Sequence, residues 1–121
     1  MVAGKKVLIV EDEAISALSL KNVLANWKYD VCGLASTGEE AIDIAGKERP
    51  DIILMDINLR GNIDGIGAAR EIISRFNIPI VFMSGYAEKE VREAAGFNFK
   101  VKFLSKPFTP KKLREMLESI A

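Results

Sequence analysis

Histidine is absent from the 121-residue sequence, and this absence restricts the chemistry of the chain more than any other feature of its composition. Without imidazole, the chain contains no Ser-His-Asp or Cys-His catalytic arrangement, and it lacks a common metal ligand. A metal site built by this chain alone must use oxygen ligands, which favours Mg²⁺, Ca²⁺ or Mn²⁺. The sequence also contains no glycine-rich phosphate-binding loop of either common type.

Three further absences bear on location and partners. The single cysteine, Cys32, cannot form an internal disulfide and fits a reducing cytoplasm. No apolar run approaches the roughly 20 residues that a membrane-spanning helix needs, and the N-terminus has too few apolar residues for a signal peptide. Basic and acidic side chains balance at 17 each, so net charge gives no general attraction to nucleic acid or membranes. We expect a cytoplasmic protein that binds neither directly.

Apolar runs and amphipathic patterns alternate along the chain, which is long enough for one domain over residues 1–121. Apolar runs bounded by polar or turn residues predict buried strands over residues 6–10, 30–35, 51–56 and 79–84. Residues 99–105 alternate apolar residues with lysine, which predicts a half-exposed edge strand. Apolar residues at helical spacing predict helices around Leu20–Trp27, Ala69–Phe76 and Leu113–Ile120, and residues 88–95 predict a more polar, loosely held one.

Two capping patterns complete the set of predicted helices. Thr37 with Glu40 has the spacing of a capping box, and Thr109 followed by Pro110 predicts the start of the last helix. The resulting order, a strand followed by a helix five times, implies an α/β fold with a doubly wound parallel sheet and right-handed crossovers. In such sheets the functional crevice lies beyond the carboxyl ends of the strands.

Polar residues stand at those carboxyl ends. Glu11 and Asp12 follow the first predicted strand, Asp56 ends the third, Ser84 ends the fourth and Lys106 follows the fifth. Three clustered carboxylates repel one another, so Lys106 and a divalent cation would be needed to neutralise them. Such a set suits metal-assisted phosphoryl transfer, in which an aspartate can accept the phosphoryl group as an acyl phosphate.

The segments VLIVEDE, DIILMDI, FMSGY and FLSKPF resemble the receiver domain of response regulators in two-component signalling. The similarity covers essentially the whole chain, with the four segments in the family's order and spacing. It implies a flavodoxin-like fold with five helices and a parallel sheet in the order 2-1-3-4-5. It also implies a signalling switch that catalyses only its own phosphorylation and dephosphorylation, either as a stand-alone protein or as a piece of a longer regulator or hybrid kinase.

The resemblance assigns a phosphoacceptor and a metal site. Asp56 matches the residue that accepts the phosphoryl group from a phosphohistidine of a sensor histidine kinase or phosphotransfer protein. Asp12 matches a direct ligand of Mg²⁺ (or Mn²⁺), and Glu11 matches its acidic neighbour, which usually acts through water. Asn58 matches the position whose backbone carbonyl binds the metal. The resemblance does not name the effector that reads the switch.

Further residues match the family's switching apparatus. Ser84 matches the hydroxyl that bonds the phosphoryl oxygen, and Lys106 matches the cation that pairs first with Asp56 and then with the phosphate. The Lys106–Pro107 peptide bond matches one that is cis in the family. Phe103 matches an aromatic switch that turns inward when the Ser84 loop moves, but it shares a face with Val101, so a simple core role is equally open.

The chain departs from the family pattern after Asp56. The run NLRGNIDG replaces the common Met-Pro, and Gly65 falls one residue later than usual, so we expect the longer loop over residues 57–65 to affect kinase selectivity. A metal-dependent phosphatase with an aspartyl nucleophile usually has a second acid two residues further on, where this chain has Asn58.

Four alternatives stay open at this point. The first is that the chain is a phosphatase or phosphotransferase, and the second is that it is an interaction module that works without phosphorylation. The third is that Glu11 and Asp12 merely cap the first helix. The fourth is that a basic cluster near the C-terminus binds nucleic acid, although a solvated surface is the favoured interpretation of its residues: Lys100, Lys102, Lys111, Lys112 and Arg114.

Overall fold

The computed structural model describes residues 4–59, 61–85 and 101–120. A single sheet contains five parallel strands, which are β1 (Lys6–Val10), β2 (Asp30–Ala35), β3 (Ile52–Asp56), β4 (Ile80–Ser84) and β5 (Val101–Ser105). Their order is β2-β1-β3-β4-β5. The described helices are α1 (Ala14–Asn26), α2 (Gly38–Glu48), α3 (Gly65–Phe76) and α5 (Pro110–Ile120). The predicted flavodoxin-like arrangement and strand order are therefore confirmed.

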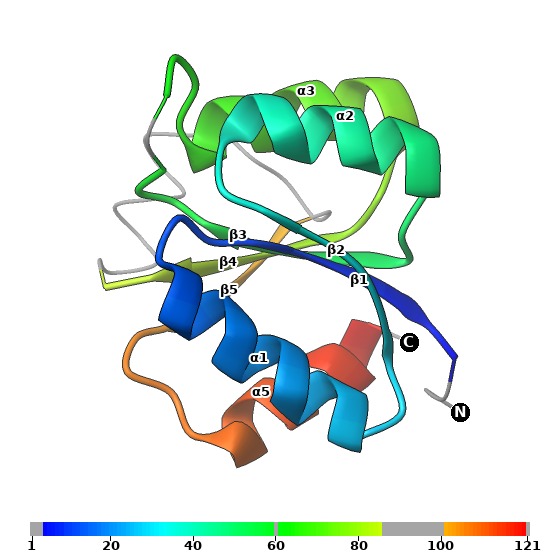
Figure 1. Ribbon diagram of the computed structural model, residues 1–121, viewed down its shortest axis with the longest axis vertical. Coiled ribbons are helices and arrows are strands. Elements are labelled where there is room, and N and C mark those ends of the chain that lie inside the picture. The colour runs from blue at the N-terminus through cyan, green and yellow to red at the C-terminus, as the bar shows by residue number, and fades with distance from the viewer. Residues whose placement is uncertain (1–3, 60, 86–100, 121) are drawn as a thin grey trace.

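The helices cover both faces of the sheet, with α2 and α3 on one side and α1 and α5 on the other (Figure 1). Because successive side chains of a strand point to opposite faces, β1 supplies Leu8 and Val10 to one core and Val7 and Ile9 to the other. Strand β3 divides in the same way, and all five of its residues are buried. Because both faces of these strands are buried, their sequences are continuous runs of apolar residues.

The two predicted helix caps form. The Thr37 side chain accepts a hydrogen bond of 3.1 Å from the Glu40 amide, and Thr109 accepts one of the same length from the Lys112 amide. Each such cap typically contributes about 1 kcal/mol to stability. The Glu40 carboxylate reaches one residue further back than a capping box requires, where it accepts from the Ser36 hydroxyl at 2.7 Å.

Two predicted strand starts differ from the structure by one residue each. Strand β3 begins at Ile52 and β4 at Ile80, one residue later than the apolar runs indicated. Pro79 has no amide hydrogen to donate, and it contributes only its carbonyl, which accepts from the Ile53 amide at 3.1 Å. Strand β5 lies at an edge of the sheet, as predicted, with Lys102 exposed.

Part of the prediction lies outside the described residues. This applies to the polar helix over residues 88–95 and to the first two residues of the predicted edge strand, Phe99 and Lys100. Four of the five predicted helices are thus described. Within the described ranges, no helix is both long enough and apolar enough to span a bilayer.

Candidate functional site

The carboxyl ends of β1 and β3 bring three acids together. These strands are adjacent and in register, with Val10 opposite Met55, so the residues that follow them lie side by side. One carboxylate oxygen from each of Glu11, Asp12 and Asp56 lies within 4.8 Å of the other two. Glu11 and Asp56 are only 6 % and 7 % exposed. The acids that the sequence placed at two strand ends therefore form one cluster.

Lys106 reaches this cluster from the far edge of the sheet. Its ammonium nitrogen lies 3.4 Å from Oδ2 of Asp56 and 3.8 Å from Oε2 of Glu11. The Lys106 amide donates to the Ser84 carbonyl at 2.7 Å, which extends the pairing of β4 with β5 by one residue. The Lys106–Pro107 peptide bond is cis, which agrees with the isomer implied by the family resemblance.

The remaining predicted residues surround Asp56. Ser84 ends β4 beside β3 and is 5 % exposed. The Asn58 amide donates a hydrogen bond of 3.1 Å to Oδ1 of Asp56, so both oxygens of this carboxylate have a partner on the protein. The Phe103 ring packs against Phe82 with their centroids 5.6 Å apart, a position that suits either a core residue or a switch.

The electrostatics of the cluster fit a hard divalent cation. Burial, followed by the hydrogen bond and charge of Asp56, raises the pKa of Glu11 from 4.5 to about 7, while Lys106 opposes this shift. Among the described residues, the buried Oε2 of Glu11 has no hydrogen-bond partner. An all-oxygen set with surplus negative charge, in which a buried oxygen has an ion pair but no hydrogen bond, is suited to Mg²⁺ or Mn²⁺.

One alternative for the acids is wrong. Helix α1 begins at Ala14, and its N-cap residue is Glu13, with an extended backbone at φ −93° and ψ 113°. The Glu13 carboxylate accepts from the Ser16 hydroxyl at 2.8 Å. Glu11 and Asp12 precede the cap position, so capping α1 does not account for them.

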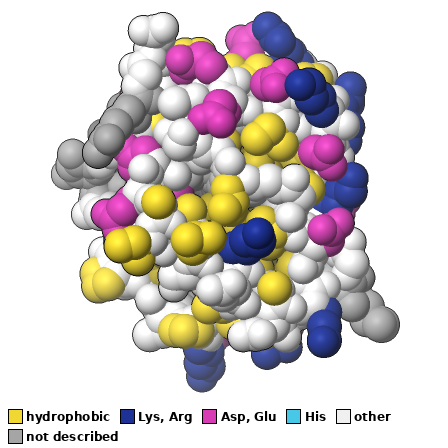
Figure 2. All heavy atoms as spheres, in the orientation of Figure 1, with side chains coloured by type: hydrophobic (Ala, Val, Ile, Leu, Met, Phe, Trp, Pro, Cys, Tyr) yellow, Lys and Arg dark blue, Asp and Glu magenta, His cyan; other side chains and the backbone are white. Residues whose placement is uncertain are grey.

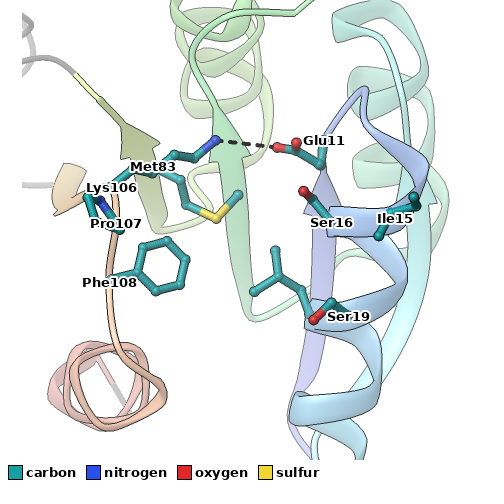
Figure 3. Close-up of a pocket in the computed structure, with 9 residues that line it drawn as sticks. Glu11, Ile15, Ser16, Ser19, Met83, Lys106, Pro107 and Phe108 are labelled. Carbon is teal, nitrogen blue, oxygen red and sulfur yellow. Dashed lines mark ion pairs between the residues drawn. The ribbon is translucent and has the colours of Figure 1, made fainter.

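A pocket that the sequence did not reveal lies beside the acidic cluster. The pocket has a volume of about 600 Å³ and lies between α1 and the segment after β5 (Figure 3). Ser16 and Ser19 of α1 lie across it from Pro107 and Phe108, Glu11 and Lys106 lie at one end, and Ile15 also contributes to its lining. Ile15 and Leu18 are 79 % and 52 % exposed. Their only signal in the sequence was that they fall outside the buried stripe of α1.

A family model of the response regulator receiver domain matches residues 7–118, which include every member of the cluster. The chain belongs to the response regulator receiver family. Proteins of this family act as signalling switches in two-component systems, so the predicted family and class of function are confirmed. Receiver domains bind Mg²⁺ in an acidic pocket, and this chain has such a cluster at the corresponding strand ends.

Curated relatives include proteins of different lengths. The receiver domain is 35 % identical over 120 residues to the chemotaxis protein CheY of Thermotoga maritima, and the match covers 98 % of both chains. It is also 35 % identical over 105 residues to the transcriptional regulatory protein PdtaR of Mycobacterium tuberculosis, covering 87 % of this chain and 51 % of PdtaR. The chain thus spans about half the length of PdtaR.

Solved structures support the same assignment. The receiver domain of sensor histidine kinase PA1611 from Pseudomonas aeruginosa aligns with a TM-score of 0.83 at 33 % identity, covering 97 % of each chain. That structure is described as having a magnesium ion coordinated in its active site cleft. The receiver domain of a modulated diguanylate cyclase from Desulfovibrio desulfuricans aligns with a TM-score of 0.85 at 36 % identity, covering 97 % of this chain and 93 % of the other.

Proposed function

We propose that Asp56 accepts a phosphoryl group from a phosphohistidine of a sensor histidine kinase or phosphotransfer protein, in a reaction that depends on Mg²⁺ or Mn²⁺. The observation that carries this proposal is the position of Asp56, which is buried at a strand end between two further acids and the Lys106 ammonium. The histidine-free sequence supports it, because the phosphodonor must then be another chain or domain.

The chemistry requires little beyond positioning and neutralisation of charge. An oxygen of the Asp56 carboxylate attacks phosphorus. As the new P–O bond forms, the P–N bond of the donor breaks, and its electron pair returns to the imidazole nitrogen, which takes up a proton to give neutral histidine. Glu11, Asp12, Asp56 and the backbone carbonyl of Asn58 would hold the metal. When bound, the metal supplies positive charge to the phosphoryl oxygens.

Phosphorylation would then change the conformation of the protein. It adds a group of about −2 charge at the strand ends. In the proposal, the Ser84 hydroxyl and Lys106 ammonium bond to this group and draw their loops inward, and Phe103 follows. A difference of a few kcal/mol in stability between two conformations is enough to shift their populations usefully. In this proposal the chain is a switch, and the only reactions that it catalyses are the formation and hydrolysis of its own acyl phosphate.

The exposed face of α1 supports docking of the phosphodonor beside Asp56. Of the 13 residues of α1, only Lys21 is charged, and hydrophobic side chains gather on the same side of the molecule in Figure 2. The pocket next to α1 shares Glu11 and Lys106 with the acidic cluster, so an apolar surface docked there would bring its phosphohistidine to Asp56.

The relatives differ in output: one structural relative is described as an anti-anti-sigma factor and PdtaR as a transcriptional regulator, so the effector class is open.

Intact mass after incubation with acetyl phosphate and Mg²⁺ tests the proposal. We expect a gain of about 80 Da that is absent in Asp56→Asn and absent when EDTA replaces the metal. Asp43→Asn, which changes an exposed acid in α2, is the matched control and should still gain this mass. A wild-type protein that gains no mass would favour an interaction module that works without phosphorylation.

A turnover assay with a chromogenic phosphate ester separates the switch from a phosphatase. The proposal predicts no sustained hydrolysis. Such an enzyme protonates the leaving group with a carboxylic acid, and Asn58 has an amide in that position. Multiple turnovers lost in Asp56→Asn would assign the chain to the enzyme class instead. The cytoplasmic location expected from the single cysteine stays a prediction.

A further inference from the structure

The segment after β3 folds back, so that its last residues contact its first residues. We call the described residues 57–59 and 61–64 the metal loop, because Asn58 belongs to it. The Gly65 and Leu59 amides both donate to the Ile57 carbonyl, at 2.9 and 3.2 Å. A Cβ on Gly65 would overlap the carbonyl oxygen of Asp56. The end of the metal loop therefore packs directly on the backbone of the proposed phosphoacceptor.

Ile63 lies in a notch formed by two glycines from different helices. A Cβ added to Gly67, in the first turn of α3, would lie only 2.6 Å from Cγ2 of Ile63. A Cβ added to Gly38, the first residue of α2, would lie 2.9 Å from the Ile63 carbonyl oxygen and 3.2 Å from its Cβ. Side chains at these two positions would displace Ile63. The isoleucine is thus held between the first turns of α2 and α3.

Other contacts hold the same segment from both sides. Asp64 follows Ile63 and caps α3 by accepting a hydrogen bond of 2.9 Å from the Gly67 amide. Nearer the middle of the metal loop, a Cβ on Gly61 would lie 3.2 Å from a carboxylate oxygen of Glu39 in α2. Ile63 itself is partly buried and packs against the core between the sheet and these helices. Ile63 is therefore the apolar anchor of the outer part of the metal loop, while Ile57 and Leu59 pack its first part against the same core.

We infer that Ile63 is a positioning residue for the metal site. This inference rests on the proposed function, in which the Asn58 carbonyl binds the metal. Gly65 fixes the end of the metal loop against Asp56, and Ile63 fixes its outer part against α2, which limits where the backbone of Asn58 can lie. Loss of the anchor gives the metal loop more conformations, so binding Mg²⁺ then costs more entropy. Groups that orient metal ligands in this way typically affect affinity by about tenfold or more.

Substitutions of Ile63 test the inference on the full chain. Ile63→Ala removes Cγ2 and should weaken Mg²⁺ binding about tenfold. Ile63→Val keeps Cβ and Cγ2 in the notch and should retain wild-type affinity. Calorimetric titration of metal-free protein with MgCl₂ measures the affinity, and thermal unfolding of the same samples measures stability. With acetyl phosphate, Ile63→Ala should need about tenfold more Mg²⁺ for half-maximal rate but reach a similar maximal rate.

The notch can be closed from its other side. Gly67→Ala places a methyl group against Cγ2 of Ile63 and should weaken Mg²⁺ binding at least as much as Ile63→Ala. The matched control is Gly46→Ala, also within a helix, where the atoms nearest to the new Cβ belong to the Phe76 ring, at 3.1 Å and beyond, and not to the metal loop. This control should bind Mg²⁺ normally. In the double variant Gly67→Ala with Ile63→Ala the clash no longer exists, so affinity should equal that of Ile63→Ala alone.

The outcomes separate this inference from the proposed function. If wild type and Ile63→Ala bind Mg²⁺ equally well while Ile63→Ala unfolds at a lower temperature, Ile63 is a packing residue only. The inference is then overturned, and the proposed function stands. If the wild-type protein binds no Mg²⁺, both are overturned. Weaker binding in Ile63→Ala and Gly67→Ala, with normal binding in Ile63→Val and Gly46→Ala, supports both.

Discussion

The Lys106 ammonium lies 3.4 Å from Oδ2 of Asp56, a residue fifty positions earlier in the chain. The same nitrogen lies 3.8 Å from Oε2 of Glu11. Because these carboxylates are buried and close together, the positive charge of Lys106 offsets part of the repulsion between them, and it opposes the rise in the pKa of Glu11. Lys106 is itself 38 % exposed at its side chain, so it can exchange these partners for a phosphoryl group arriving from solvent.

Replacing Lys106 with methionine should slow phosphorylation sharply. Lys106→Met keeps the aliphatic chain but removes the charge proposed to stabilise the transferring group, so we expect a loss of about a hundredfold in rate. The rate is measured as mass gained per unit time with acetyl phosphate and saturating Mg²⁺. Lys102→Met, which changes an exposed lysine of the preceding strand β5, is the control. Equal rates in the two variants would remove Lys106 from the mechanism.

The metal-free protein should become less stable as pH rises from about 4.5 to about 7. Burial and the nearby Asp56 raise the pKa of Glu11 from 4.5 to about 7, so the folded protein keeps a proton that the unfolded chain releases. The stabilisation that comes from holding this proton is complete below pH 4.5 and is lost as pH passes 7. Urea unfolding in EDTA across this range measures it. Glu11→Gln should lose this part of the pH dependence; parallel curves for the two proteins would contradict the assignment.

Phe103 offers a test of core against switch. The tilted pair with Phe82 suggests that Phe103→Leu costs about 1 kcal/mol of stability in the unphosphorylated protein. A residue that serves only the core would cost the same after phosphorylation. A switch residue that turns inward would cost more in the phosphorylated state, because its ring is then more deeply buried. Urea unfolding of both states, with Phe103→Leu compared with wild type, distinguishes the two roles.

Gly65 should tolerate no side chain. Helix propensity alone would make Gly65→Ala stabilising by about 1 kcal/mol. The overlap of the new Cβ with the Asp56 carbonyl outweighs this gain, and we expect a net loss of at least about 3 kcal/mol. Gly85→Ala is the comparison, because no described atom lies within 4 Å of its added Cβ. It should change stability by less than about 0.5 kcal/mol in urea unfolding.

The strands were predictable because their sequence signals are local and strong, whereas their order in the sheet came from the family resemblance. A strand covered on both faces must be apolar throughout, and only Ile52–Met55 and the similar runs satisfy this. The strand ends then placed Asp56 and Lys106 at one edge by topology alone. The first residue of each strand was less predictable. Pro79, for example, has no amide hydrogen to donate, and β4 begins only at the next residue.

Other features depend on how elements approach one another. Nothing local marks Gly38 and Gly67 as two walls of one notch, because they belong to helices that meet only in the folded protein. The pocket beside α1 is similar: Phe108 looks like an ordinary apolar residue until the chain folds and places it across from Ser16 and Ser19. The start of α1 was equally hidden, because Glu11, Asp12 and Glu13 follow one another and only the folded backbone shows that Glu13 occupies the N-cap position.

The placement of Lys106 has a consequence during synthesis on the ribosome. All three acids of the cluster are translated before the lysine that neutralises them, and β5 must join the sheet before that lysine can reach them. A nascent chain that has not yet added this last strand therefore carries its acids without their counterion. Competence to receive a signal would thus be acquired only after β5 and Lys106 have been translated, when this edge of the sheet is completed.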